Sequence, residues 1–138
     1  MPTPHAFLTA EDRADIRALT SRYAHALDRH DWRRLESVFA PDATMEFADL
    51  PAETGPSAIA GVCARALEPL DASQHLVGSA LLESDGDAVT VSSYFHAQHV
   101  RSIDGHTELF TVAGTYDDVV EHRPEGWRIV LRRQSVSW

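Results

Sequence analysis

Cysteine is nearly absent from this sequence, and long apolar runs are absent altogether. Cys63 is the only cysteine among 138 residues, so no intrachain disulfide can form, and a reducing compartment is favoured. Residues 1–8 lack the basic and apolar segments of a signal peptide, and no apolar run approaches the roughly 18 residues that a membrane span requires. We therefore expect a cytoplasmic protein without membrane contact, in which Cys63 is a small buried residue.

Positive charge is scarce as well. The chain carries 12 basic and 21 acidic side chains, which gives a formal net charge of −9. A surface of this sign repels phosphate backbones and provides no basic patch for nucleic acid. We expect no nucleic-acid partner.

Several motifs that carry chemistry are also missing. The sequence contains no Gly-x-Ser-x-Gly elbow, no phosphate-binding glycine loop and no dinucleotide fingerprint. It has eight histidines, but His96 and His99 are three residues apart on an expected strand and should face opposite sides. We therefore expect neither a metal nor a cofactor, and proton transfer by a histidine remains the best-supported chemistry.

The first half of the chain has helical periodicity and the second half has strand periodicity. Helices are expected over residues 9–30, 31–39 and 55–70, with Pro41 after the second helix and a short strand at 44–48. After residue 74 the apolar period drops to two, which predicts an antiparallel meander of strands at 75–83, 88–101, 107–121 and 127–137. This order predicts an α+β fold with one domain over residues 1–138 and an ordered core over about 9–138.

Alternation along the strands indicates which side chains face inward. His99 shares a face with the apolar residues of the second long strand, so it is either a core residue or a pocket residue. Phe110 and Tyr116 share one face of the next strand. Arg132 and Arg133 must face opposite sides of the last strand, and which of them faces the pocket stays open.

Asp28 and His75 are the strongest candidates for a catalytic pair. A carboxylate that fixes one tautomer of an imidazole makes it a usable proton acceptor near neutral pH. Tyr23 could donate a hydrogen bond to an oxygen that gains charge, but Tyr23 and Asp28 lie roughly 140° apart around an ideal helix. Both can serve one cavity only if the cavity wraps the helix end or the helix distorts near Leu27.

These residues belong to a series of short motifs that extends over most of the chain. In order they are Arg22-Tyr23-Ala24, Leu27-Asp28, Asp31-Trp32, the segment 39–43, Gln74-His75, Gly114-Thr115-Tyr116-Asp117 and Gly126-Trp127-Arg128-Ile129. In this order and spacing they resemble the SnoaL-like branch of the nuclear transport factor 2-like superfamily, which includes scytalone dehydratase, bile acid 7α-dehydratase and a dehydrochlorinase. The resemblance implies a cone-shaped α+β fold in which three N-terminal helices pack on a curved, mostly antiparallel sheet.

The same resemblance implies a function. In dehydratase and dehydrochlorinase members the helix Asp and the strand His form the catalytic dyad with the Tyr nearby, roles that fall here on Asp28, His75 and Tyr23. We expect a cofactor-independent lyase that acts on a small, largely apolar cyclic substrate. The candidate substrate contacts are His99, Phe110, Tyr116 and Arg132.

Two alternatives remain open at this point. An isomerase or polyketide cyclase would use the same dyad, and a noncatalytic ligand-binding or subunit protein would use the same fold. The noncatalytic alternative predicts that Asp28 and His75 lie out of hydrogen-bond reach or that apolar side chains fill the cavity. The resemblance also implies a homodimer or homotrimer formed through the outer sheet face, with candidate contacts at Thr90, Ser92, Tyr94, His96 and Val100.

Overall fold

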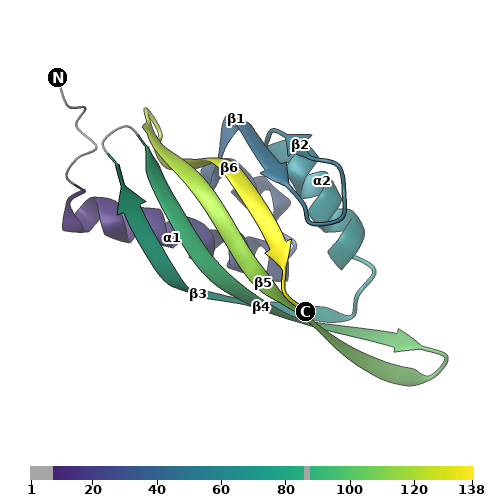
Figure 1. Ribbon diagram of the computed structural model, residues 1–138. Helices are drawn as coiled ribbons and strands as arrows, with labels where there is room; N and C mark the ends of the chain where they lie inside the picture. Colours follow the sequence, from purple (N-terminus) through teal and green to yellow (C-terminus); the bar gives the residue numbers. More distant parts are fainter. Residues whose placement is uncertain (1–7, 86–87) are drawn as a thin grey trace.

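A computed structural model describes residues 8–85 and 88–138 of the protein. Three helical segments and a curved sheet make up the fold (Figure 1). In chain order the elements are α1 (Ala10–Asp28), the 3-10 helix η2 (Trp32–Ser37), β1 (Phe39–Glu46), β2 (Glu53–Thr54), α2 (Pro56–Leu67), β3 (Ala72–Ser84), β4 (Val89–Ile103), β5 (His106–Arg123) and β6 (Gly126–Val136). The expected α+β class and cone-type architecture are confirmed.

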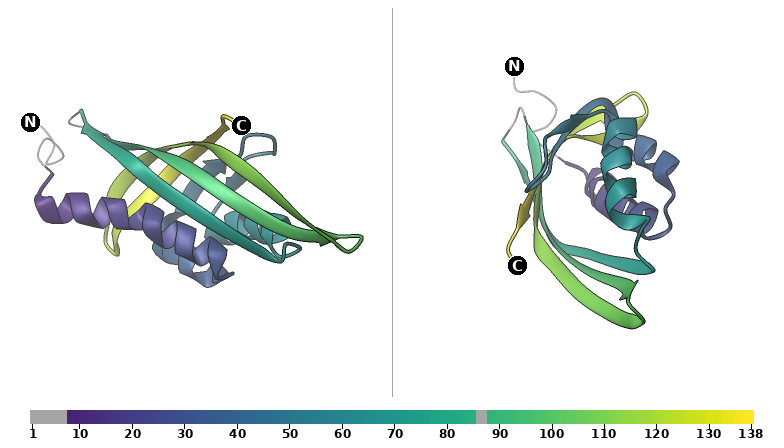
Figure 2. Two further views of the ribbon diagram at one scale, coloured as in Figure 1. Left: turned by 90° about the horizontal axis from the view of Figure 1, so that it is seen from below. Right: turned by 90° about the vertical axis from the view of Figure 1, so that its right-hand side faces the viewer.

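The six strands form one sheet in the order β2-β1-β6-β5-β4-β3. Strands β3 to β6 are the predicted antiparallel meander, and β1 runs parallel to β6. The helices cover one face of this sheet, and the sheet curves around them (Figure 2). Strand β3 is an edge strand of this sheet and packs beside α1.

The start of α1 follows the capping rules that its sequence suggests. The Thr9 hydroxyl accepts a hydrogen bond from the main-chain N–H of Asp12, and the Asp12 carboxylate accepts one from Thr9. The indole of Trp127 donates to the other oxygen of Asp12 at 3.1 Å, which ties the helix to β6. The apolar stripe of α1 then packs against the sheet through Ile16, Leu19, Tyr23 and Leu27.

The inward face of β4 agrees with the expected alternation. Its buried members are Val89, Val91, Ser93, Phe95, Ala97 and His99. Their neighbours Tyr94 and His96 are exposed on the other face. His99 therefore belongs to the inner face, and His96 to the outer face, as the strand period predicts.

Two local expectations were wrong. Pro41 does not terminate a helix but lies within β1, whose irregular pairing with β6 between Phe39 and Thr44 accommodates it. A register shift opposite Val119 and Val120 places an extra residue, Val130, in β6. This bulge puts Arg132 on the inner face together with Trp127 and Ile129, whereas strict alternation would separate them.

Within residues 8–85 and 88–138, no helix has both the length and the apolar composition needed to cross a membrane.

Candidate functional site

Asp28 and His75 contact each other through three polar interactions. The His75 ring Nδ1 lies 2.7 Å from Asp28 Oδ1, and the His75 main-chain N–H donates to Oδ1 at 3.1 Å and Oδ2 at 3.0 Å. The His75 side chain is 7% exposed and that of Asp28 is 21% exposed. The structure thus brings together two residues that lie 47 positions apart in the sequence.

The fold explains why the carboxylate reaches both nitrogens. Asp28 is the last residue of α1, and His75 lies on the edge strand β3. An edge strand has main-chain N–H groups without a strand partner, and Asp28 accepts the one from His75. A carboxylate at a helix C-terminus opposes the helix dipole, and these hydrogen bonds offset that unfavourable position.

This contact fixes the tautomer of His75. A carboxylate accepts hydrogen bonds and cannot donate them, so Nδ1 must carry the proton. In the neutral ring Nε2 then has the free lone pair, and no described residue forms a hydrogen bond with it. The arrangement provides an oriented base at the wall of a cavity.

A cavity of about 360 Å³ lies between the helices and the inner sheet face, and His75 lines it. Its apolar lining comes from Leu27, Phe47, Leu50, Val62, Ala66, Leu67, Phe95, Ala97, Val112 and Val136, among others. Its polar lining consists of Tyr23, Asp49, Cys63, His75, His99, Tyr116 and Gln134. None of the described lining residues is an arginine, and the sequence contains no lysine, so this lining has no fixed cation.

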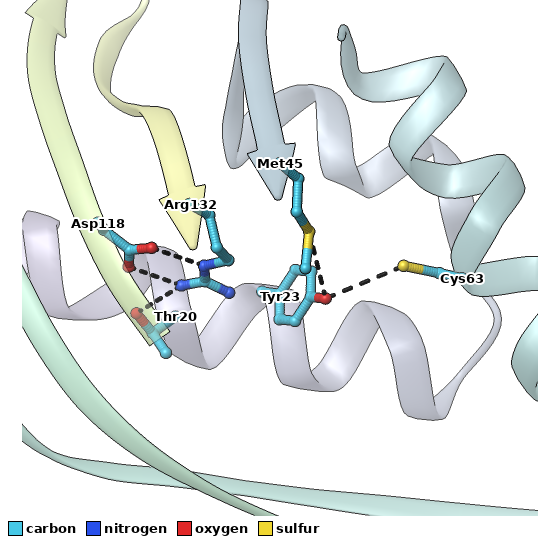
Figure 3. Close-up of polar contacts among 6 residues, drawn as sticks. All are labelled: Thr20, Tyr23, Met45, Cys63, Asp118 and Arg132. Carbon is cyan, nitrogen blue, oxygen red and sulfur yellow. Dashed lines mark hydrogen bonds and ion pairs between the residues drawn. The ribbon is translucent and has the colours of Figure 1, made fainter. Parts of the chain in front are cut away.

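Tyr23 lies on the cavity wall and is almost fully buried. Its hydroxyl lies 3.9 Å from the Cys63 sulfur and 4.0 Å from that of Met45 (Figure 3). Burial raises the pKa of Tyr23 well above its ordinary value, so the phenol keeps its proton. Tyr23 and Asp28 therefore need not face the same cavity. Tyr23 and Leu27 line the cavity, whereas Asp28 does not line it and contacts His75 from behind.

His99 lies beside His75 on the adjacent strand. The two rings meet edge to face with centroids 6.0 Å apart, and Phe110 stacks on His99 at 4.7 Å. His99 is 8% exposed, and its Nδ1 has no hydrogen-bond partner among the described residues. Burial first, and the neighbouring His75 second, lower the pKa of His99, which favours its neutral form.

Two expected substrate contacts lie elsewhere. Arg132 does not line the cavity, because its guanidinium is fully buried and forms a two-bond ion pair with Asp118, at 2.8 Å for each bond (Figure 3). It also lies 4.5 Å from the ring centroid of Tyr23 and 4.2 Å from that of Tyr116. Phe110 does not line the cavity either and reaches the site only through His99. Of the candidate substrate contacts, His99 and Tyr116 line the cavity.

Several lining residues were not identified from the sequence. Phe47, Asp49 and Leu50 come from the segment between β1 and β2, and Gln134 and Val136 come from the end of β6. Gln134 and Val136 lie on the same face of β6 as Arg132, beyond the Val130 bulge, so only knowledge of that bulge would reveal them. Cys63 is buried as expected, and burial raises the pKa of its thiol to about 11.

Metal-binding geometry is not found in the described part of the chain. No group of three or more His, Cys, Asp or Glu side chains there is arranged to hold an ion. His96 and His99 lie on opposite faces of β4.

The sequence matches a known family over most of its length. The model of the family described as "SnoaL-like domain" matches residues 8–133. The uncharacterized protein Rv2910c of Mycobacterium tuberculosis is 29% identical over 123 residues, which span 88% of this chain and 82% of that protein.

Solved structures share the fold. The crystal structure of LinA aligns with a TM-score of 0.80 and 22% identity over 91% of this chain and 86% of that one. A protein of Novosphingobium aromaticivorans provisionally named as a scytalone dehydratase aligns with a TM-score of 0.78 and 18% identity, over 91% of this chain and 84% of its own. At these identities the likeness establishes the architecture and not the reaction.

Proposed function

Because the chain belongs to the SnoaL-like domain family, which supplies the fold and the pocket, we propose that it is a cofactor-independent lyase. The proposed reaction is elimination of water, or of another small leaving group, from a neutral and largely apolar cyclic molecule. The observation that carries the proposal is the 2.7 Å contact between Asp28 and His75 at the wall of an apolar cavity.

The cavity lining supports this substrate class. Most of the lining is apolar, and Asp49, which is the one acidic side chain among the described lining residues, disfavours an anionic ligand. Arg132 cannot compensate, because Asp118 neutralises it within the core. A neutral ring compound with a carbonyl and a hydroxyl group fits these constraints.

Proton transfer by His75 is the proposed chemical step. Nε2 removes a proton from the carbon next to the carbonyl group, and the electron pair of that C–H bond forms the new C=C bond as the leaving group departs. The proton on the imidazolium then passes to the departing hydroxyl, so water leaves and His75 returns to its neutral form. Asp28 holds the ring and stabilises the imidazolium, and Tyr23 donates a hydrogen bond to the carbonyl oxygen as it gains charge.

An isomerase or polyketide cyclase remains the second candidate. The same base in the same cavity would remove the same proton, and the reaction would differ only in whether the proton returns to the product. The name of the related Novosphingobium aromaticivorans protein favours elimination.

The noncatalytic alternative has less support. It requires that Asp28 and His75 lie out of hydrogen-bond reach or that apolar groups fill the cavity. Neither condition is met, because Asp28 and His75 lie 2.7 Å apart and a cavity of about 360 Å³ is present.

Product mass tests the proposal directly. Incubation with a panel of neutral cyclic β-hydroxyketones should give products that have lost one water. Products of unchanged mass would instead support the isomerase or cyclase, and saturable binding without turnover across the panel would support the noncatalytic alternative. A matched panel of carboxylate analogues should bind more weakly because of Asp49.

We also propose that two or three copies associate through the outer sheet face. This face has a hollow of about 560 Å³ next to Leu76, Tyr94 and Trp138, which are 61%, 64% and 71% exposed. Such a cluster of large exposed apolar side chains is typical of an interaction surface. Light scattering should show a dimer or trimer, and Tyr94→Asp should shift the mass toward the monomer.

A further inference from the structure

A polar pocket, separate from the cavity of His75, lies between α1 and the edge strand β3, where the two elements run side by side (Figure 2). Its volume is about 260 Å³, and it shares no lining residue with the cavity of His75. Arg17, Thr20 and Ser21 contribute from α1, and Ser79 and Ser93 contribute from the sheet. The proposed elimination uses none of these residues.

A β-bulge creates this pocket. The pairing of β3 with β4 shifts between Gly78 and Leu81, and Ser79 adopts a positive φ of 52°. A bulge bends its strand and interrupts the ladder, and here the interruption lies opposite Ser93 of β4. The bulge therefore opens the sheet edge at a point where hydroxyl groups gather.

The hydroxyl of Ser93 has no hydrogen-bond partner among the described residues. Ser93 is 1% exposed, and its Oγ forms no hydrogen bond with any described residue. A buried hydroxyl without a protein partner is unfavourable, so such a group usually forms a hydrogen bond with an ordered water or a bound ligand. Ser93 lines the pocket and can donate its proton there.

Thr20 is a second buried donor. It is 6% exposed, and its oxygen accepts a long hydrogen bond of 3.4 Å from Nη2 of Arg132 (Figure 3). The Thr20 hydroxyl also carries one proton, which it can donate to an acceptor.

The charge of the pocket is positive. Arg17 lies on its wall and forms no ion pair with any described residue, and none of the described lining residues is acidic. Asp118 does not line the pocket, and its carboxylate is paired with Arg132. Hydroxyl donors together with one guanidinium form a donor set that matches a tetrahedral anion.

We propose that this pocket binds a small tetrahedral oxyanion, either as a free inorganic ion or as the terminal phosphate of a small organic molecule. Arg17 supplies the charge, and the hydroxyls of Thr20, Ser21, Ser79 and Ser93 supply hydrogen bonds. The site lies apart from the cavity of His75, so it can exist whether or not the proposed elimination takes place.

Titration with inorganic phosphate, followed by amide chemical shifts, tests this proposal. Saturable shifts should appear in the 17–21 and 77–80 segments and at Ser93, and Arg17→Gln and Ser93→Ala should each weaken binding by about tenfold or more. Arg13→Gln is the matched control, because Arg13 is an exposed arginine on the same helix that does not line the pocket. Glycerol phosphate distinguishes the two sources, since tighter binding than inorganic phosphate indicates an organic ligand and equal or weaker binding indicates the free ion.

Thermal unfolding without phosphate separates binding from structure. Ser93→Ala removes an unpartnered hydroxyl, so the variant should be at least as stable as the wild type while it loses the stabilisation that phosphate gives. The absence of saturable shifts in the wild type, or equal weakening by Arg13→Gln, would overturn the proposal.

Discussion

Asp28 accepts hydrogen bonds from both the main-chain N–H and the ring Nδ1 of His75. One carboxylate therefore anchors the edge strand and orients the imidazole that the strand carries. This double role joins the fold to the proposed chemistry, because the group that fixes the tautomer also fixes the backbone from which the ring projects.

The double role predicts a specific defect in Asp28→Asn. An asparagine oxygen can still accept the main-chain N–H, so the variant should fold, but it no longer requires a proton on Nδ1 of His75. Nitrogen NMR of labelled histidine should show the Nδ1–H tautomer for His75 in the wild type and a mixture in the variant. A wild-type protein with mixed tautomers at His75 would contradict the assigned geometry.

The two neighbouring arginines of β6 should differ sharply in their contribution to stability. Arg132 forms a fully buried pair with Asp118, whereas Arg133 is 62% exposed and bonds to Glu46. Asp118→Asn leaves a buried cation without its carboxylate and should lower the free energy of unfolding by about 3–5 kcal/mol.

Arg133→Gln is the control for this comparison. It removes an exposed ion pair and should cost about 1 kcal/mol or less. Urea unfolding measures both values, and equal costs for Asp118→Asn and Arg133→Gln would refute the structural assignment.

Gly114 lies where the end of β6 passes close to β5. A Cβ at this position would lie 1.8 Å from the Ser135 carbonyl oxygen, so the backbone must move in Gly114→Ala. We expect a cost of about 3 kcal/mol or more in the free energy of unfolding. Gly78→Ala is the matched strand control, since no atom lies within 4 Å of a Cβ there, and it should change stability by no more than about 0.5 kcal/mol.

His99 should make the fold sensitive to mild acid. Its pKa in the folded protein lies below the ordinary value of 6.5, chiefly because burial disfavours the charged ring. As the pH falls below about 6.5 the unfolded chain binds a proton more readily than the folded protein, so stability decreases there and is unaffected above it.

Replacement of His99 with Phe removes this contribution. Between pH 7 and pH 5, the free energy of unfolding should fall less in His99→Phe than in the wild type. His96→Gln, on the exposed face of the same strand, is the matched control for the loss of a histidine. An unchanged slope in His99→Phe would show that His99 protonates as easily in the folded state as in the unfolded chain.

The parts of the site that could be predicted from sequence lie on elements where buried and exposed residues alternate regularly. The stretch before and after Phe95 has a strict period of two, so the inward position of His99 and the outward position of His96 followed directly. The helix and strand that carry Asp28 and His75 were also evident from their periods. Their contact depends on packing, and only the family resemblance suggested it.

The other residues of the site could not be predicted because they lie where the regular residue pattern of a strand is interrupted or absent. The bulge at Val130 reverses the faces of β6, and no turn or glycine signal in the sequence marks it. This reversal sends Arg132 into the core and Gln134 to the cavity. The segment that carries Phe47 has no period, so its place at the cavity comes from tertiary packing.

The most direct test of the account compares His75→Gln with His96→Gln in turnover of a neutral cyclic β-hydroxyketone. Both variants remove one histidine from neighbouring strands, but only His75 lines the cavity and contacts Asp28. The account predicts that His75→Gln lowers kcat by about 10²–10⁴-fold while the fold is retained, and that His96→Gln leaves it unchanged. Full activity in a folded His75→Gln protein would contradict the assignment of His75 as the base.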